Sequence, residues 1–168
     1  MSIIKSIEAP PSAFEIATRI AVSPVISTDY KLKLWARHRG GRLLVVDDSP
    51  VERAVTTGLL EKAGFKVVSA TNGVEAVSII RDSPLPFDVV VMDVSMPELD
   101  GIAATRKIRA LPPPRSHVPI IALTSNTHAE DRAACLAAGM NEHTAKPASM
   151  TALLLAMHAH LTPKGATT

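Results

Sequence analysis

The chain has 168 residues, 46% of them hydrophobic, and its 18 Lys and Arg nearly balance its 16 Asp and Glu. This length and apolar content suit one compact domain with some chain left over, and they exclude wholesale disorder. The single cysteine, Cys135, excludes a disulfide framework and a CxxC site. No apolar run approaches the roughly 20 residues of a membrane helix, and the first thirty residues lack the layout of a signal peptide. We therefore expect a cytoplasmic protein without a membrane segment.

Positive charge is concentrated at the start of the chain. Residues 1–39 carry six Lys or Arg and three acidic residues, whereas residues 40–168 carry twelve Lys or Arg and thirteen acidic residues. The five aromatic residues are too few for a surface on which nucleic-acid bases could stack. The body of the chain is therefore not expected to bind nucleic acid.

Residues 1–41 are predicted to form an N-terminal extension or linker. A short helix is predicted over residues 12–22. Residues 30–35 alternate like a strand, but they could equally belong to a basic helix that extends through Arg39. The leader could be a poorly ordered linker, or an arm that packs on the following domain or on a second copy of the chain, with Trp35 as its anchor.

From residue 42 to residue 161, short apolar runs alternate with amphipathic stretches. Strands are predicted at residues 43–46, 66–69, 88–92, 118–123 and 141–145. Helices are predicted to open at or near Ser49, Asn72, Asp100, Thr127 and Ser149. At the first of these, Glu52 follows Ser49 by three residues and completes a capping box. Five strand–helix units predict a doubly wound parallel α/β sheet with helices on both faces. Residues 162–168 would be a C-terminal tail, too short for an output domain.

Apolar spacing predicts which side of three helices faces the sheet. In a helix that packs on a sheet, apolar residues recur every three or four positions. The predicted stripes are Val51, Val55, Leu59 and Ala63; Ala133, Leu136 and Ala137; and Leu153, Leu154, Met157 and Leu161.

Polar residues occupy the ends of the predicted strands. Asp47 and Asp48 end the first strand, Asp93 the third, Thr124 the fourth and Lys146 the fifth. In parallel sheets these ends meet at one edge, where ligands bind. Clustered carboxylates raise each other's pKa values, and a divalent cation such as Mg²⁺ relieves their repulsion. Thr124 and Lys146 can then hold anionic oxygens while a carboxylate attacks phosphorus.

Four stretches carry a resemblance to a known family: LLVVDDSP (43–50), MDVSMPELDG (92–101), IIALTSN (120–126) and GMNEHTAKP (139–147). Together, residues 42–161 resemble a receiver domain of two-component response regulators, especially the receivers attached to hybrid sensor histidine kinases. The resemblance implies a flavodoxin-like (βα)5 fold with strand order 2-1-3-4-5. It also implies a phosphoacceptor signalling domain rather than an enzyme. Such a domain would catalyse only its own phosphorylation and slow dephosphorylation. The chain could be autonomous or a fragment of a hybrid kinase.

The same resemblance implies partners and a metal site. A sensor histidine kinase or a histidine phosphotransfer protein would donate the phosphoryl group, and a second copy of the chain could form a homodimer. Asp93 would accept the phosphoryl group. Asp48 would bind Mg²⁺ directly, Asp47 would support the metal shell, and the backbone carbonyl of Ser95 would be a further ligand.

The remaining implied roles concern the bound phosphoryl group. Thr124 and Lys146 would bind its oxygens, while Ser95 and Asn126 would tune the lifetime of the acyl phosphate. Thr124 would also be part of the switch, together with His143, which stands where the family usually has Tyr or Phe. Because imidazole is titratable, we expect the inward or outward position of His143 to depend on pH, with acid favouring the outward one.

Two other functions remain as alternatives. A Mg²⁺-dependent phosphohydrolase with an aspartyl-phosphate intermediate would need an Asp two residues after its nucleophile, where this chain has Ser95. A phosphate-independent, protein-binding module of receiver-like fold would not need the acidic residues or Lys146. The sequence argues against both of these functions.

Overall fold

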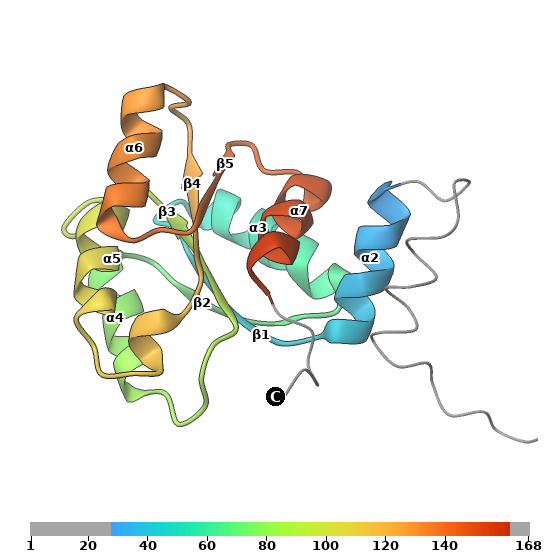
Figure 1. Cartoon of the computed structure of the whole chain (residues 1–168), viewed down its shortest axis with the longest axis horizontal. Helices are drawn as coiled ribbons and strands as arrows, with labels where there is room; N and C mark the ends of the chain where they lie inside the picture. The colour runs from blue at the N-terminus through green and yellow to red at the C-terminus, as the bar shows by residue number, and fades with distance from the viewer. Residues whose placement is uncertain (1–27, 162–168) are drawn as a thin grey trace, which may run out of the picture.

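The computed structural model describes residues 28–161, which form a five-stranded parallel sheet between two layers of helices (Figure 1). The strands are β1 (Arg42–Val46), β2 (Lys66–Ala70), β3 (Val89–Asp93), β4 (Ile120–Thr124) and β5 (Glu142–Ala145). They lie in the order β2-β1-β3-β4-β5, and each neighbouring pair is parallel. This is the strand order that the sequence resemblance implies. The helix predicted over residues 12–22 and the tail at residues 162–168 lie outside the described residues.

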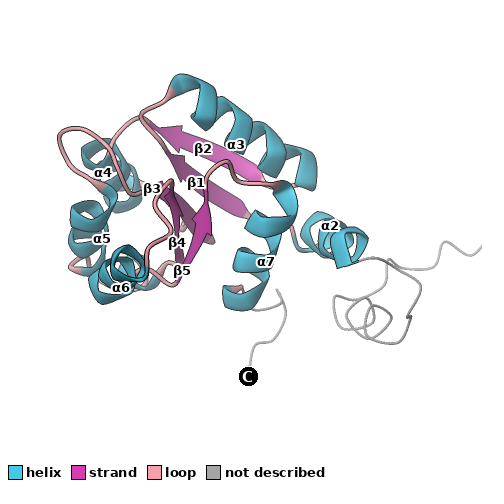
Figure 2. Ribbon diagram, turned by 90° about the horizontal axis from the view of Figure 1, so that it is seen from above, coloured by secondary structure: helices cyan, strands magenta, loops and turns pink. Residues whose placement is uncertain are grey.

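Helices cover both faces of the sheet, as Figure 2 shows. The helices are α2 (Thr28–Arg39), α3 (Pro50–Ala63), α4 (Gly73–Asp82), α5 (Gly101–Arg109), α6 (Ala129–Ala138) and α7 (Met150–His160), with a short 3₁₀ helix at Arg115–His117. One layer contains α3 and α7, with α2 outside them, and the other contains α4, α5 and α6. Among residues 28–161, no helix is long and apolar enough to cross a membrane.

The central strands are apolar on both faces because both faces are covered. Leu43 and Val45 join the core cluster with α3 and α7, whereas Leu44 and Val46 join the cluster with α4 and α5. This alternation follows from the pleat of a strand, in which successive side chains point to opposite faces. Every residue of β3 and β4 is buried. The continuous apolar runs of the sequence are therefore explained by double-sided burial.

Most predicted helix starts are confirmed by their N-caps. The side chains of Ser49, Asn72, Asp100 and Ser149 each accept a hydrogen bond from the backbone N–H three residues later. The predicted cap at Thr127 is wrong, because α6 begins one residue later, after His128, whose side chain makes no capping bond.

The stripe predicted for the first half of α3 is wrong. Val51 and Val55 are 72% and 54% exposed, and the helix instead buries Thr56, Leu60 and Ala63. The reason is geometric: the first turns of α3 lie beyond the carboxyl edge of the sheet, and Val51 and Val55 line a cleft there. Only the second half of α3 packs over the strands.

The stripe predicted for α6 is also wrong, and the stripe for α7 is confirmed. In α6, Cys135 and Ala138 are buried, while Leu136 is half-exposed. A short helix over the edge of the sheet covers few residues, so its narrow buried face cannot be identified from an alanine-rich pattern. All four residues of the α7 stripe are buried: Leu153, Leu154, Met157 and Leu161.

Helix α2 precedes the five strand–helix units and packs against them. Of the two alternatives for residues 30–35, the helix is confirmed, and Leu32 on it is buried. The Trp35 ring centroid lies 4.9 Å from that of His158 on α7 and 6.4 Å from that of Phe65. Residues 28–39 are therefore an arm that packs on the rest of the chain through Trp35.

Candidate functional site

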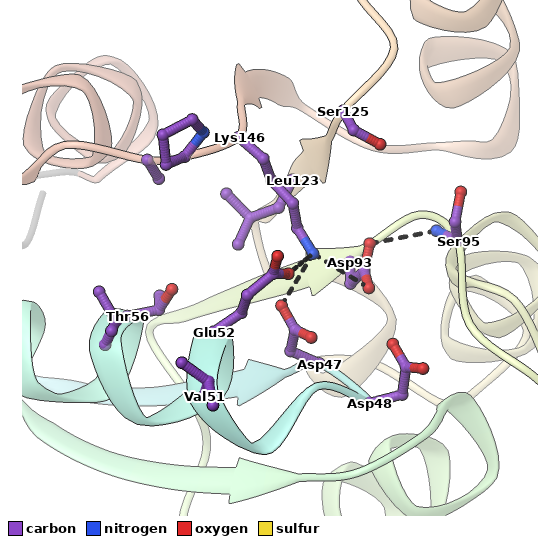
Figure 3. Close-up of a pocket in the computed structure, with 13 residues that line it drawn as sticks. Asp47, Asp48, Val51, Glu52, Thr56, Asp93, Ser95, Leu123, Ser125 and Lys146 are labelled. Carbon is purple, nitrogen blue, oxygen red and sulfur yellow. Dashed lines mark hydrogen bonds and ion pairs between the residues drawn. The ribbon is translucent and has the colours of Figure 1, made fainter.

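The carboxyl ends of the strands surround an open cleft of about 540 Å³. Asp47 and Asp48 follow β1, Asp93 ends β3, and Lys146 follows β5. Figure 3 shows their side chains pointing toward one another from these three elements. Four of the five residues predicted at the strand ends therefore line one cleft, together with Ser95. The fifth, Thr124, is not among the lining residues.

Three carboxylates in this cleft are arranged as metal ligands would be. One oxygen each of Asp47, Asp48 and Asp93 lies within 4.8 Å of the other two. Asp47 and Asp93 are buried, whereas Asp48 is exposed to the cleft. Buried carboxylates without full charge compensation are unfavourable, and hard oxygen donors of this kind suit Mg²⁺. The residues present therefore fit a divalent cation.

Lys146 supplies the positive charge of the cleft. Its Nζ lies 2.5 Å from Oε2 of Glu52, 3.0 Å from Oδ2 of Asp47 and 3.2 Å from Oδ2 of Asp93 (Figure 3). Burial lowers the pKa of the Lys146 ammonium, but hydrogen bonds to Glu52 and Asp47 and the charges of Asp93 and Asp47 outweigh it. The pKa therefore lies above its ordinary value, and the side chain is a permanent cation.

Asp93 has a perturbed pKa of about 6. Burial is the largest cause and raises the pKa, Lys146 opposes it, and the charge of Asp47 adds to it. The predicted repulsion between carboxylates is therefore present, although burial contributes more. The backbone N–H of Ser95 donates a hydrogen bond to Oδ1 of Asp93, at 3.2 Å, and fixes the orientation of this carboxyl group.

Thr124 and Asn126 contact each other rather than the carboxylates. The Thr124 hydroxyl donates to the backbone carbonyl of Asn126, at 2.9 Å, and accepts from its N–H, at 3.0 Å. The next strand places His143 opposite Ala122, and its Nδ1 lies 3.3 Å from Oε1 of Glu142. The predicted switch residues are therefore on neighbouring strands, and each is hydrogen-bonded within its own segment.

Glu52 is the site residue that sequence reasoning missed. The pattern of a capping box predicts that its carboxylate reaches back to the N-terminal end of α3. Half of that prediction is confirmed, because the Ser49 hydroxyl accepts from the Glu52 N–H. The other half is wrong, because the Ser49 N–H donates to Asp47 and the Glu52 carboxylate binds Lys146. The only sequence signal was the position of Glu52, one turn after a strand end.

A family model describes residues 43–158 as a response regulator receiver domain. The chain belongs to the response regulator receiver family. Similar curated proteins are two-component system protein A from Emericella nidulans, 42% identical over 146 residues, and sensor histidine kinase GacS from Pseudomonas protegens, 40% identical over 113 residues. These matches cover 86% and 66% of this chain but only 20% and 12% of the relatives. The chain thus spans a fifth or less of their length.

Two solved receiver structures resemble the fold closely. The receiver domain of sensor histidine kinase PA1611 from Pseudomonas aeruginosa PAO1 gives a TM-score of 0.66 at 38% identity, covering 72% of this chain and 97% of that domain. That structure has a magnesium ion coordinated in its active-site cleft. Chemotaxis protein CheY4 of Vibrio cholerae gives a TM-score of 0.66 at 30% identity, covering 72% of this chain and 98% of CheY4. The predicted flavodoxin-like fold is confirmed.

Proposed function

We propose that this receiver is a phosphoacceptor in a phosphorelay, with Asp93 as the residue that is phosphorylated. The observation that supports this role best is the contact of the Lys146 ammonium with the buried carboxylates of Asp93 and Asp47 in an open cleft. The donor would be a phosphohistidine on a sensor histidine kinase or on a histidine phosphotransfer protein. Sensor histidine kinase GacS is among the curated relatives, which is consistent with such a donor.

The proposed transfer requires one bond to form and one to break. An oxygen of the Asp93 carboxylate forms a bond to phosphorus while the bond from phosphorus to the donor nitrogen breaks, and the electron pair stays on the imidazole. Lys146 offsets the charge of the phosphoryl oxygens. A Mg²⁺ ion held by Asp47, Asp48, Asp93 and the backbone carbonyl of Ser95 would add positive charge at the same oxygens.

Further roles are proposed for residues around the phosphoryl position. We propose that the Thr124 hydroxyl exchanges its Asn126 partner for a phosphoryl oxygen, since Thr124 ends the strand beside β3. Ser95 and Asn126 would then set how readily water reaches the acyl phosphate. His143, on the strand next to Thr124, would move with this exchange and alter the surface of β5 and α7.

The proposal is tested by incubating the protein with Mg²⁺ and acetyl phosphate and measuring its intact mass. We expect the wild type to gain one phosphoryl group and Asp93→Asn to gain none. Lys146→Ala should label more slowly, because it keeps the carboxylates but loses the ammonium. Labelling of Asp93→Asn to the wild-type extent would contradict the assignment.

A further inference from the structure

We infer that Glu52 is a positioning residue that competes with the phosphoryl group for the Lys146 ammonium and thereby weakens phosphoryl binding. The inference rests on the proposed function of Asp93 and Lys146. Glu52 is not one of the three carboxylates that are arranged like metal ligands, and it does not lie at the end of a strand.

The first observation is the order of the distances around Lys146. Its Nζ is closest to Glu52, at 2.5 Å, and farther from Asp47 and Asp93, at 3.0 and 3.2 Å. The Glu52 side chain is 53% exposed, whereas the Lys146 side chain is only 15% exposed. Figure 3 shows the Glu52 side chain reaching from α3 to the ammonium. Glu52 therefore holds Lys146 from the solvent side.

The second observation is that the backbone around Glu52 is fixed on the site. Its N–H donates to the Ser49 hydroxyl, and the next residue, Arg53, donates from Nη1 to the Asp47 carbonyl at 2.7 Å. The Ser49 N–H is bound by Asp47, so the Glu52 carboxylate is not needed for the helix cap. The first turn of α3 therefore presents this carboxylate to Lys146.

The third argument concerns charge. Asp47 and Asp93 contact Lys146 but also belong to the three carboxylates that fit a divalent cation. A cation held by those carboxylates would offset their negative charge, whereas Glu52, outside the cluster, would keep its full charge beside Lys146. A phosphoryl group on Asp93 brings new negative charge to the same ammonium. Glu52 then repels the phosphoryl charge, and it shares the Lys146 ammonium that would otherwise neutralise that charge.

The test compares Glu52→Gln with Glu61→Gln, an exposed carboxylate near the other end of the same helix. The probe is beryllium trifluoride, a non-covalent phosphoryl mimic, titrated in the presence of Mg²⁺ and followed by calorimetry. Because exposed ion pairs are weak, we expect Glu52→Gln to bind the mimic about threefold more tightly than wild type. Glu61→Gln should bind it like wild type. Equal or weaker binding by Glu52→Gln would overturn the inference.

Salt dependence separates the electrostatic role from a structural one. The gain in Glu52→Gln should shrink as ionic strength rises, because salt screens a half-exposed charge. A gain that salt does not change would result from packing and would overturn the inference. Labelling with acetyl phosphate distinguishes the two proposals. If wild type is labelled on Asp93 but Glu52→Gln binds the mimic no better, only the role of Glu52 fails. If Asp93 is never labelled, both proposals fail.

Discussion

Asp93→Asn should stabilise the metal-free protein at neutral pH, although it removes the proposed phosphoacceptor. Burial raises the pKa of Asp93 from 3.8 to about 6, against the opposing effect of Lys146. Between these two values the folded state holds a proton that the unfolded state has lost. The stabilisation from the neutral acid is complete below pH 4 and is lost as the pH rises through 6. The difference between the folded and unfolded pKa of Asp93 corresponds to a loss of ~3 kcal/mol in the free energy of unfolding at pH 7.5.

Asparagine cannot ionise, so the variant escapes this penalty. We expect urea unfolding in EDTA, followed by Trp35 fluorescence, to give Asp93→Asn a free energy of unfolding about 2–3 kcal/mol above wild type at pH 7.5. The difference should be close to zero at pH 4. Glu130→Gln, an exposed carboxylate on α6, is the matched control and should show no such change. A variant less stable than wild type at pH 7.5, or a difference that does not vary with pH, would refute the reasoning.

Three further predictions concern the metal, the arm and the ammonium. Millimolar Mg²⁺ should raise the melting temperature of wild type, because an ion that binds only the folded state stabilises it, and EDTA should reverse this rise. The rise should be smaller in Asp48→Asn. Trp35→Ala should lower the free energy of unfolding by about 2 kcal/mol in urea titrations followed by circular dichroism, because the variant lacks the contacts of the indole ring with Phe65 and with His158 on α7. No loss of stability would contradict the packing of the arm. Lys146→Ala should bind beryllium trifluoride at least about tenfold more weakly in calorimetry, since charge-assisted contacts are strong; unchanged affinity would exclude this ammonium from the site.

The fold and most of the cleft could be predicted from the sequence for local reasons. Four-residue apolar runs indicate strands that are covered on both faces, and the capping residues Ser49, Asn72 and Ser149 give the helix starts. Because parallel strands end at one edge, placing Asp47 and Asp93 at strand ends was enough to bring them together. The order of the strands came from the resemblance to receivers and not from the pattern.

What failed depended on tertiary geometry. Val51 and Val55 have the spacing of a buried stripe, but the position of α3 along the sheet leaves them at the cleft. Glu52 has the position of a capping residue, but Lys146, ninety-four residues away, is the stronger partner. Residues 30–35 were compatible with two local structures, and packing on α7 favours the helix. No local pattern contains these distant contacts.

The central claim is that Asp93 carries the phosphoryl group, and mapping the modified residue tests it most directly. Wild-type protein is treated with Mg²⁺ and phosphoramidate, which contains the P–N bond of a phosphohistidine donor, and then with borohydride. Borohydride reduces an acyl phosphate to an alcohol, so a phosphorylated Asp becomes homoserine. Peptide mass spectrometry should find homoserine at position 93 in wild type and at no position in Asp93→Asn. Homoserine at position 47 or 48, with Asp93 intact, would contradict the account.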